Sequence, residues 1–269
     1  ASLSLINNGF VIIENAFSEI EVSELRCVVD EYVPQLKENN NNEYSNFNNK
    51  LVPFIHDKFL LSPIIIDTIE KSINKQNSKK EFLRVRENSR IIWFSASNKN
   101  IENNWTGRWH VDFPTQFVAH VILDDLNVSN TRMQALPCSH DFFLVSGRHY
   151  DLNNLIEKNK LENKIVDFYG KKGTLYIHCG NVLHRNMPAV NTSRYLWGAT
   201  YTTDKVFYLN DKEKSKEFYF ESEELINNMS LNSKNRIEGL LLSKQKTFND
   251  RGYYKIIDGN KFEKANKAD

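Results

Sequence analysis

The stretch Arg108-Trp109-His110-Val111-Asp112-Phe113 decides how the rest of this chain is interpreted. His110 and Asp112 are two residues apart, and on an extended strand that spacing puts both side chains on the same face. One more histidine on that face would place two imidazoles and one carboxylate around a metal ion. This donor set is the facial triad of non-haem Fe(II) oxygenases. His184, in the strand-like run Asn-Val-Leu-His-Arg-Asn at 181–186, is the candidate for the second imidazole.

The region around these residues is a series of short runs typical of strands, separated by turn residues. We expect strands at 90–96, 108–113, 116–126, 131–136, 164–169, 174–179, 182–186 and 194–203. Short strands in this number suggest a double-sheet jelly roll. The expected fold class is therefore mainly β with flanking helices, built around a double-stranded β-helix (jelly roll, cupin-like) core.

His-x-Asp alone is a weak signal in a chain with seven histidines, so its surroundings carry the interpretation. Phe113-Pro114 follows the motif, and a proline there ends the strand and leaves both ligands near the mouth of the barrel. Arg194 opens the strand after His184. Its guanidinium matches the far carboxylate of 2-oxoglutarate in a planar, two-pronged way that lysine lacks. Taken alone, Arg194 is better explained as a surface or sheet-edge cation. The order His110, Asp112, His184 and Arg194 favours the cosubstrate anchor.

The flanks of the expected jelly roll have helical patterns, and a single domain over residues 1–269 is the simplest organisation. A capping box at Ser18-Glu19-Ile20-Glu21 predicts one helix, and Ser62-Pro63 predicts another. Apolar residues recur at helical spacing between 225 and 242. We expect a helical N-terminal part at 1–83, the jelly-roll core at about 84–204 and a helical C-terminal tail at 205–269.

Composition limits the class of partner. The chain has 35 basic and 34 acidic residues and a formal charge of +1, so no long-range field would recruit nucleic acid or an anionic membrane. No apolar run approaches the roughly 18–20 residues that cross a bilayer, and the first residues lack the features of a signal peptide. Three scattered cysteines form neither a disulfide framework nor a zinc site and suit a cytoplasmic location. A small-molecule substrate is the expected partner, and the sequence does not indicate an oligomeric state.

Three further segments carry a family resemblance: 109–112 (Trp-His-Val-Asp), 133–140 (Met-Gln-Ala-Leu-Pro-Cys-Ser-His), and 173–186 followed by Arg194. With them, the chain from residue 9 to about 203 resembles the phytanoyl-CoA dioxygenase-like family of Fe(II)/2-oxoglutarate oxygenases. The resemblance implies that His110, Asp112 and His184 hold Fe(II). It also implies that Arg194 anchors the distal carboxylate of 2-oxoglutarate and that His120 lies beside this cosubstrate.

Two positions depart from the pattern of that family. Cys138 stands where relatives have glycine before Ser-His, and we expect it to change only a turn. Leu196 stands where many relatives have Ser or Thr. The carboxylate anchor therefore loses one hydrogen bond unless Thr174, Tyr176 or Tyr201 supplies it.

The resemblance implies a dioxygenase that uses Fe(II), 2-oxoglutarate and O2 to oxidise a small metabolite and releases succinate and CO2. Hydroxylation is the favoured outcome, with desaturation or cyclisation as variants. An intact Asp112 favours oxygen transfer, because related halogenases replace this carboxylate with Gly or Ala. Two alternatives stay open: a non-catalytic jelly-roll protein that binds a small molecule or metal, and a cupin-like metal isomerase or hydrolase, which would not need Arg194.

Overall fold

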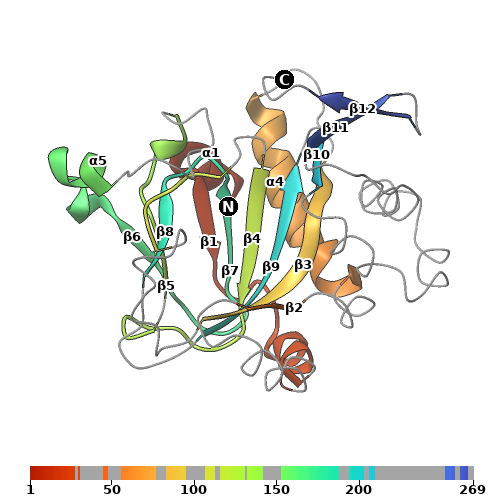
Figure 1. The fold of residues 1–269 in the computed structure, drawn as a ribbon. Helices are drawn as coiled ribbons and strands as arrows, with labels where there is room; N and C mark the ends of the chain where they lie inside the picture. Colours follow the sequence, from red (N-terminus) through yellow and green to blue (C-terminus); the bar gives the residue numbers. More distant parts are fainter. Residues whose placement is uncertain are drawn as a thin grey trace.

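Antiparallel strands form the centre of the protein, and helices pack against one side of them (Figure 1). The computed structural model describes residues 1–27, 30, 45–47, 56–76, 83–94, 107–112, 116–130, 132–141, 153–187, 194–202, 206–209, 252–257 and 261–265.

The larger sheet has six strands in the order β1-β7-β4-β9-β3-β2, each antiparallel to its neighbours. Their bounds are β1 Phe10–Ile13, β2 Ser45–Phe47, β3 Arg84–Phe94, β4 Gln116–Ile122, β7 Leu175–Cys179 and β9 Arg194–Thr202. Strand β4 lies between β7 and β9, so His120 faces Tyr176 on one side and Gly198 on the other. The side chains of His120 and Tyr176, from strands distant in sequence, therefore share one row on the inner face.

The smaller sheet has the order β6-β5-β8, and its strands are β5 Arg132–Ala135, β6 Val166–Phe168 and β8 His184–Met187. His110 adds one isolated antiparallel bridge to His184 at the edge of this sheet. The inner faces of the two sheets meet in a buried cluster that includes Ile122, Met133 and Tyr176. From β4 to β9 the chain thus crosses repeatedly between two packed sheets, which confirms the jelly-roll core and the fold class with flanking helices.

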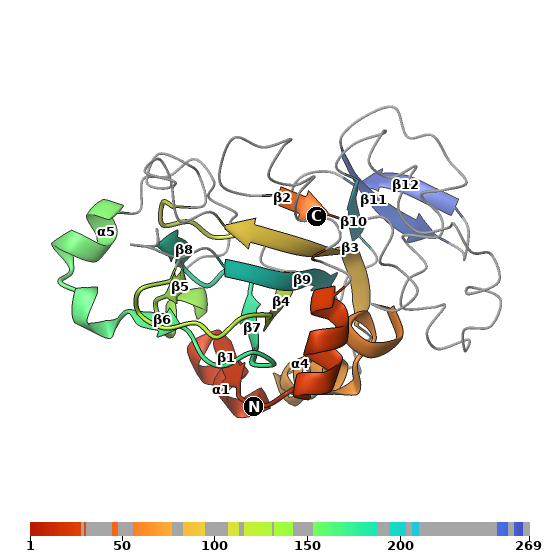
Figure 2. The same cartoon turned by 90° about the horizontal axis from the view of Figure 1, so that it is seen from below.

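The outer face of the larger sheet is covered by helices (Figure 2). These are α1 Ser2–Asn8, a helix at 19–27, the π-helix η1 His56–Leu60 and α4 Pro63–Gln76. The predicted capping box is present: Glu21 N donates to Ser18 Oγ at 3.2 Å, and Ser18 N donates to Glu21 Oε2 at 2.8 Å. Apolar residues of β4, β7 and β9 pack against these helices, which fixes the sheet that carries Arg194.

The expected strand at 108–113 is wrong over the residues that the structure describes there, 108–112. Strand β8 begins at His184, and residues 180–183 form a turn, so residues 111 and 112 have no strand to pair with. Asp112 N instead donates to Gly180 O in that turn. One β-bridge at His110 and one backbone contact from Asp112 to the turn therefore hold this segment beside His184.

The helical tail is also corrected where the tail is described. Strands β10 Val206–Leu209, β11 Gly252–Ile257 and β12 Lys261–Ala265 form a separate three-stranded antiparallel sheet. Tyr and Ile residues are concentrated in β11, which favours a strand. The residues at 225–242 that carried the helical pattern lie outside the described residues.

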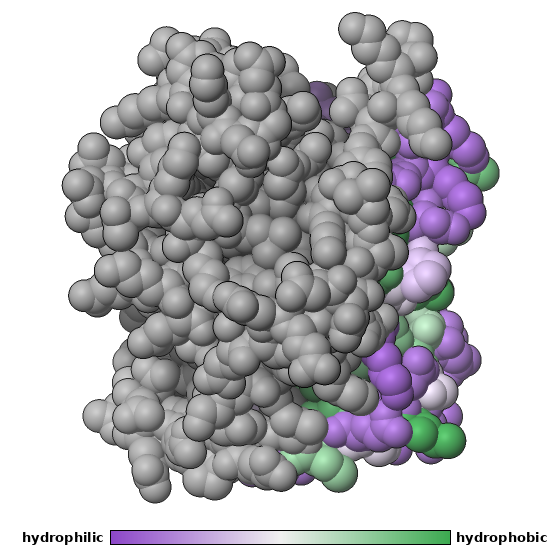
Figure 3. Space-filling model, turned by 90° about the vertical axis from the view of Figure 1, so that its right-hand side faces the viewer, coloured by the Kyte–Doolittle hydropathy of each residue, from purple (hydrophilic) through white to green (hydrophobic). Residues whose placement is uncertain are grey.

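Surface properties of the described residues are mixed. Exposed large apolar side chains are scattered over separate elements: Leu3, Ile20, Val128 and Tyr169. Figure 3 shows, along the described edge of one face, small hydrophobic groups between hydrophilic ones. Among the described helices, none has the length and apolar character that a bilayer crossing requires.

Candidate metal centre

The two predicted histidine ligands face each other across the isolated β-bridge. His110 N donates to His184 O and His184 N donates to His110 O, both at 3.0 Å. The imidazole ring centroids lie 4.3 Å apart. This reciprocal backbone pair fixes two side chains from segments far apart in sequence on the same side of the chain.

Both imidazoles are oriented by backbone carbonyls. His110 Nδ1 lies 2.7 Å from Arg108 O, and His184 Nδ1 lies 2.9 Å from Val182 O. A carbonyl oxygen only accepts, so each Nδ1 carries the hydrogen and each Nε2 keeps its lone pair. In the neutral rings this arrangement leaves both Nε2 atoms able to bind a metal ion, with their tautomers fixed by the protein.

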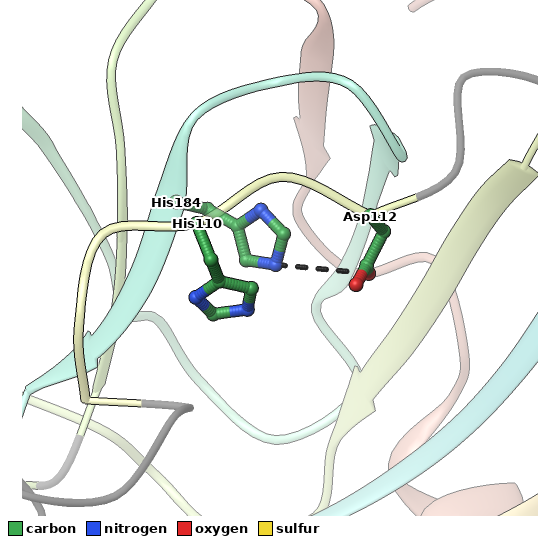
Figure 4. A group of neighbouring side chains, drawn as sticks. All are labelled: His110, Asp112 and His184. Carbon is green, nitrogen blue, oxygen red and sulfur yellow. Dashed lines mark ion pairs between the residues drawn. The ribbon is translucent and has the colours of Figure 1, made fainter. Parts of the chain in front are cut away.

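Asp112 completes the group (Figure 4). One ligand atom from each of His110, Asp112 and His184 lies within 4.8 Å of the others, and His184 Nε2 is 3.8 Å from Asp112 Oδ2. Gln116, at the start of β4, donates from Nε2 to Asp112 Oδ2 at 3.4 Å. Two imidazole nitrogens and one carboxylate oxygen on one side of a site are the donor set that suits non-haem Fe(II).

Burial determines the protonation state of His184. Burial lowers the pKa of His184 to about 4, with a smaller effect from nearby His178 in the same direction, while Asp112 and Val182 O oppose the shift. The imidazole is therefore neutral at pH 7. A metal ligand must be neutral imidazole, so the site does not have to lose a proton from His184 before it binds a cation.

Arg194 lies at the start of β9 and is fully buried. Its Nη2 donates to Asn186 Oδ1 at 2.6 Å. Asn186 is two residues after His184 on β8 and so shares its face of the strand. Burial lowers the pKa of the Arg194 guanidinium, and Tyr176 is close enough to interact with it electrostatically. The predicted cosubstrate anchor thus points between the sheets toward the strand that carries a metal ligand.

The other two predicted cosubstrate residues lie on the inner face at different heights. His120 on β4 has its ring centroid 5.1 Å from that of Tyr176 and 6.2 Å from that of His178. Thr174 is buried just before β7, and its backbone carbonyl accepts from Ile122 N at 2.9 Å. Along the inner face, His120 therefore lies between Arg194 and the rings of His178 and His184. Thr174 lies one pair of residues further along the strands from the predicted metal ligands.

Two of the three candidates for the hydrogen bond that Leu196 was expected not to supply, Tyr176 and Tyr201, lie on opposite sides of the larger sheet. Tyr201 faces the helices, where its hydroxyl donates to Leu60 O at 2.8 Å. Tyr176 faces inward, is buried beside Arg194, and burial raises its pKa to about 12. Tyr176, rather than Tyr201, is placed to act together with Arg194.

The sequence did not single out Gln116 and Asn186, and for His178 it favoured packing in the sheet over a contact with a metal ligand. His178 is 1% exposed, and its ring lies 4.6 Å from that of His184. The alternation of β7 and β8 gives a usable signal. Asn186 is two residues after His184 on β8, and His178 is two residues after Tyr176 on β7. Each therefore shares the inner face with the earlier residue.

Comparisons with known proteins support the fold. No model of a protein family matches the sequence, and no curated protein matches it either. Solved structures do match. The non-haem α-ketoglutarate-dependent epimerase SnoN from nogalamycin biosynthesis is 17% identical with a TM-score of 0.54, covering 75% of this chain and 79% of that one. The carbocyclase SnoK from the same biosynthesis is 17% identical with a TM-score of 0.53, covering 83% and 93%. The non-haem monooxygenase ThoJ, as a nickel complex, is 16% identical with a TM-score of 0.51, covering 75% and 76%. The chain shares the fold of these enzymes.

Proposed function

We propose that this protein is an Fe(II)/2-oxoglutarate-dependent dioxygenase with His110, Asp112 and His184 as the iron ligands. The observation that carries the proposal is the convergence of these three ligand atoms within 4.8 Å at the edge of a jelly roll. The resemblance of the fold to iron- and α-ketoglutarate-dependent enzymes supports it.

The protein contributes geometry and the exclusion of water. The backbone carbonyls at Arg108 and Val182 hold each Nε2 toward the metal position, and Gln116 holds the carboxylate. With O2 and 2-oxoglutarate, bound Fe(II) supplies an oxidant able to remove hydrogen from an unactivated carbon, with release of succinate and CO2. Two imidazoles and one carboxylate on one side of a bound metal would leave its remaining positions for these molecules.

Arg194 is the proposed anchor for the distal carboxylate of 2-oxoglutarate. A buried guanidinium matches a carboxylate in shape and charge, and Asn186 holds one of its nitrogens. We assign Tyr176 as the hydroxyl donor that replaces the one missing at Leu196. His120 lies beside the path from Arg194 to the metal ligands, and Thr174 lines its far end.

The substrate is proposed to be a small organic metabolite, and hydroxylation the reaction. Structures that share the fold include an epimerase in complex with Fe3+, α-ketoglutarate and nogalamycin RO, so one scaffold supports several outcomes. The family that we propose is the phytanoyl-CoA dioxygenase-like one. The mass of the product distinguishes these reactions, because hydroxylation adds one oxygen atom, whereas desaturation or cyclisation removes two hydrogens.

Anaerobic titration tests the proposal. Protein with Fe(II) should develop a weak visible charge-transfer band when 2-oxoglutarate is added, and succinate should form once air is admitted. His110→Ala should give neither the band nor succinate. A protein that binds Fe(II) but gives no band would instead be a cupin-like metal enzyme or a binding protein.

A further inference from the structure

The residues next to the metal ligands point to the outside of the small sheet. Trp109, Val111 and Leu183 belong to a buried cluster with Leu136 and Ile156, separate from the cluster between the sheets. Ile156 comes from the helix α5 Asn153–Lys158, so this insertion packs behind the ligands. The outside of the sheet is therefore built as support for the segments that carry His110 and His184.

Arg185 links these two segments from behind. It follows His184 on β8, and its guanidinium carbon lies 4.6 Å from the centroid of the Trp109 ring. Its Nε donates to Gln134 Oε1 at 2.9 Å. A planar guanidinium can stack on the indole and donate to the amide at the same time.

Gln134 is itself held in place. It lies directly opposite Arg185 on one side and Asp167 on the other, and its Nε2 donates to Asp167 Oδ1 at 2.8 Å. Arg132 Nε also donates to Asp167 Oδ1, at 2.6 Å. A polar row of Asp167, Gln134, Arg185 and Trp109, which we call the outer row, thus crosses β6, β5 and β8 and ends on the residue before His110.

The segment that carries His110 depends on such a brace because its backbone pairing is short. An isolated bridge joins His110 to His184, and Asp112 N has its contact in the turn at Gly180. Metal affinity depends on how closely the ligands are held in their bound geometry before the metal arrives. Contacts behind the ligands are one means of holding them.

We propose that Arg185 is a positioning residue of the metal centre, which clamps Trp109 against β8 and so holds His110 opposite His184. The proposal rests on the function proposed above only in taking these residues as metal ligands. Arg185 itself lies opposite Gln134 on the outer face of β8, away from the ligand atoms.

The test compares Arg185→Met with Arg132→Met. Arg132 is the matched control because it joins the same network through Asp167, yet its guanidinium donates to Asp167 and to Val128 O rather than stacking on Trp109. Cobalt(II) titration of the metal-free protein, followed by its visible absorption, should show the dissociation constant rising about tenfold in Arg185→Met. It should stay within about twofold in Arg132→Met.

A second readout needs no metal. In the metal-free protein, hydrogen exchange at the amides of His110 and His184 should accelerate about fivefold in Arg185→Met and stay unchanged in Arg132→Met. Arg185→Lys, the milder variant if Arg185→Met does not fold, keeps a cation over the indole and should give intermediate values in both measurements.

The outcomes separate this inference from the proposed function. Wild-type protein that fails to bind cobalt(II) would count against the metal centre, and the exchange experiment would then decide the role of Arg185 alone. Wild-type affinity and exchange in Arg185→Met, or in Arg185→Lys where only that variant folds, would overturn the inference. An equal loss in Arg132→Met would overturn it too, because the network would then act only on general stability.

Discussion

Arg194 and Asn186 join the two sheets through a 2.6 Å hydrogen bond from Nη2 to Oδ1. Arg194 starts β9 in the larger sheet, and Asn186 lies on β8 of the smaller sheet, two residues after His184. The contact fixes the position of a buried cation relative to His184, a proposed metal ligand. We expect this fixed arrangement to determine which distance between the two ends of a cosubstrate fits the site.

Arg194→Lys should weaken the use of 2-oxoglutarate without emptying the metal site. Lysine keeps the charge but loses the two-pronged match and the contact with Asn186, so the KM for 2-oxoglutarate should rise about 30-fold, equivalent to ~2 kcal/mol. Steady-state succinate formation measures this change, and Fe(II) affinity should stay at the wild-type value. Arg132→Lys, on the outside of the small sheet, is the control. An unchanged KM would remove Arg194 as the anchor.

Tyr176→Phe tests the second contact to the same carboxylate. Loss of a hydrogen bond to a charged group should raise the KM for 2-oxoglutarate about tenfold. Tyr201→Phe is the matched control, because its hydroxyl bonds Leu60 O on the helical side. That variant should lose about 1 kcal/mol of unfolding free energy by denaturant titration and keep its KM. A raised KM in Tyr201→Phe together with an unchanged KM in Tyr176→Phe would instead assign this contact to Tyr201.

The convergence of His110, Asp112 and His184 was predictable, because the chemistry of a facial triad restricts the residue types. The jelly-roll strand order explains why a late segment returns to an early one. The sequence was also sufficient to predict that Tyr201 and Arg194 lie on opposite faces of their strand. Its odd separation from Arg194 on an unbroken strand puts the two side chains on opposite faces.

Other features depend on tertiary contacts that no local pattern contains. The helix α1 has seven residues and one fully buried side chain, Leu5, which is too little for a periodic signal. The segment before Asp112 has a strand-like sequence, but pairing needs a partner, and β8 starts only at His184. The contact of Arg194 with Asn186 crosses between two sheets, so it follows from packing rather than from spacing.

Cys138 gives a stability prediction at the turn after β5. It has a φ of +63°, in the left-handed region that non-glycine residues adopt at a cost, and its N donates to Asn8 O at 3.0 Å. Cys138→Gly should therefore raise the unfolding free energy by about 0.5–1 kcal/mol, after the extra entropy of glycine in the unfolded chain is subtracted. Denaturant unfolding measures it. Cys138→Ala is the control, because it removes the thiol and keeps the strained backbone, so a gain there of the same size would contradict the explanation.

The buried state of His184 predicts how stability depends on pH in the metal-free protein. Its pKa is about 4 in the folded protein and close to 6.5 in the unfolded chain, so between these values the unfolded chain binds the extra proton. The contribution is fully present above pH 6.5 and is lost as pH falls from there toward 4, by about 3 kcal/mol in total.

Urea unfolding at pH 7 and pH 4, with a chelator present, measures this change. His184→Gln removes the titrating group and keeps a polar side chain of similar length, so its stability should fall less than the wild type over the same interval. The difference between the two proteins, rather than either curve, isolates His184, because the other carboxylates and histidines titrate in both. Parallel curves would mean that His184 is protonated in the folded protein at pH 4 to 6.5. A protonated imidazole could not serve as a metal ligand without first releasing that proton.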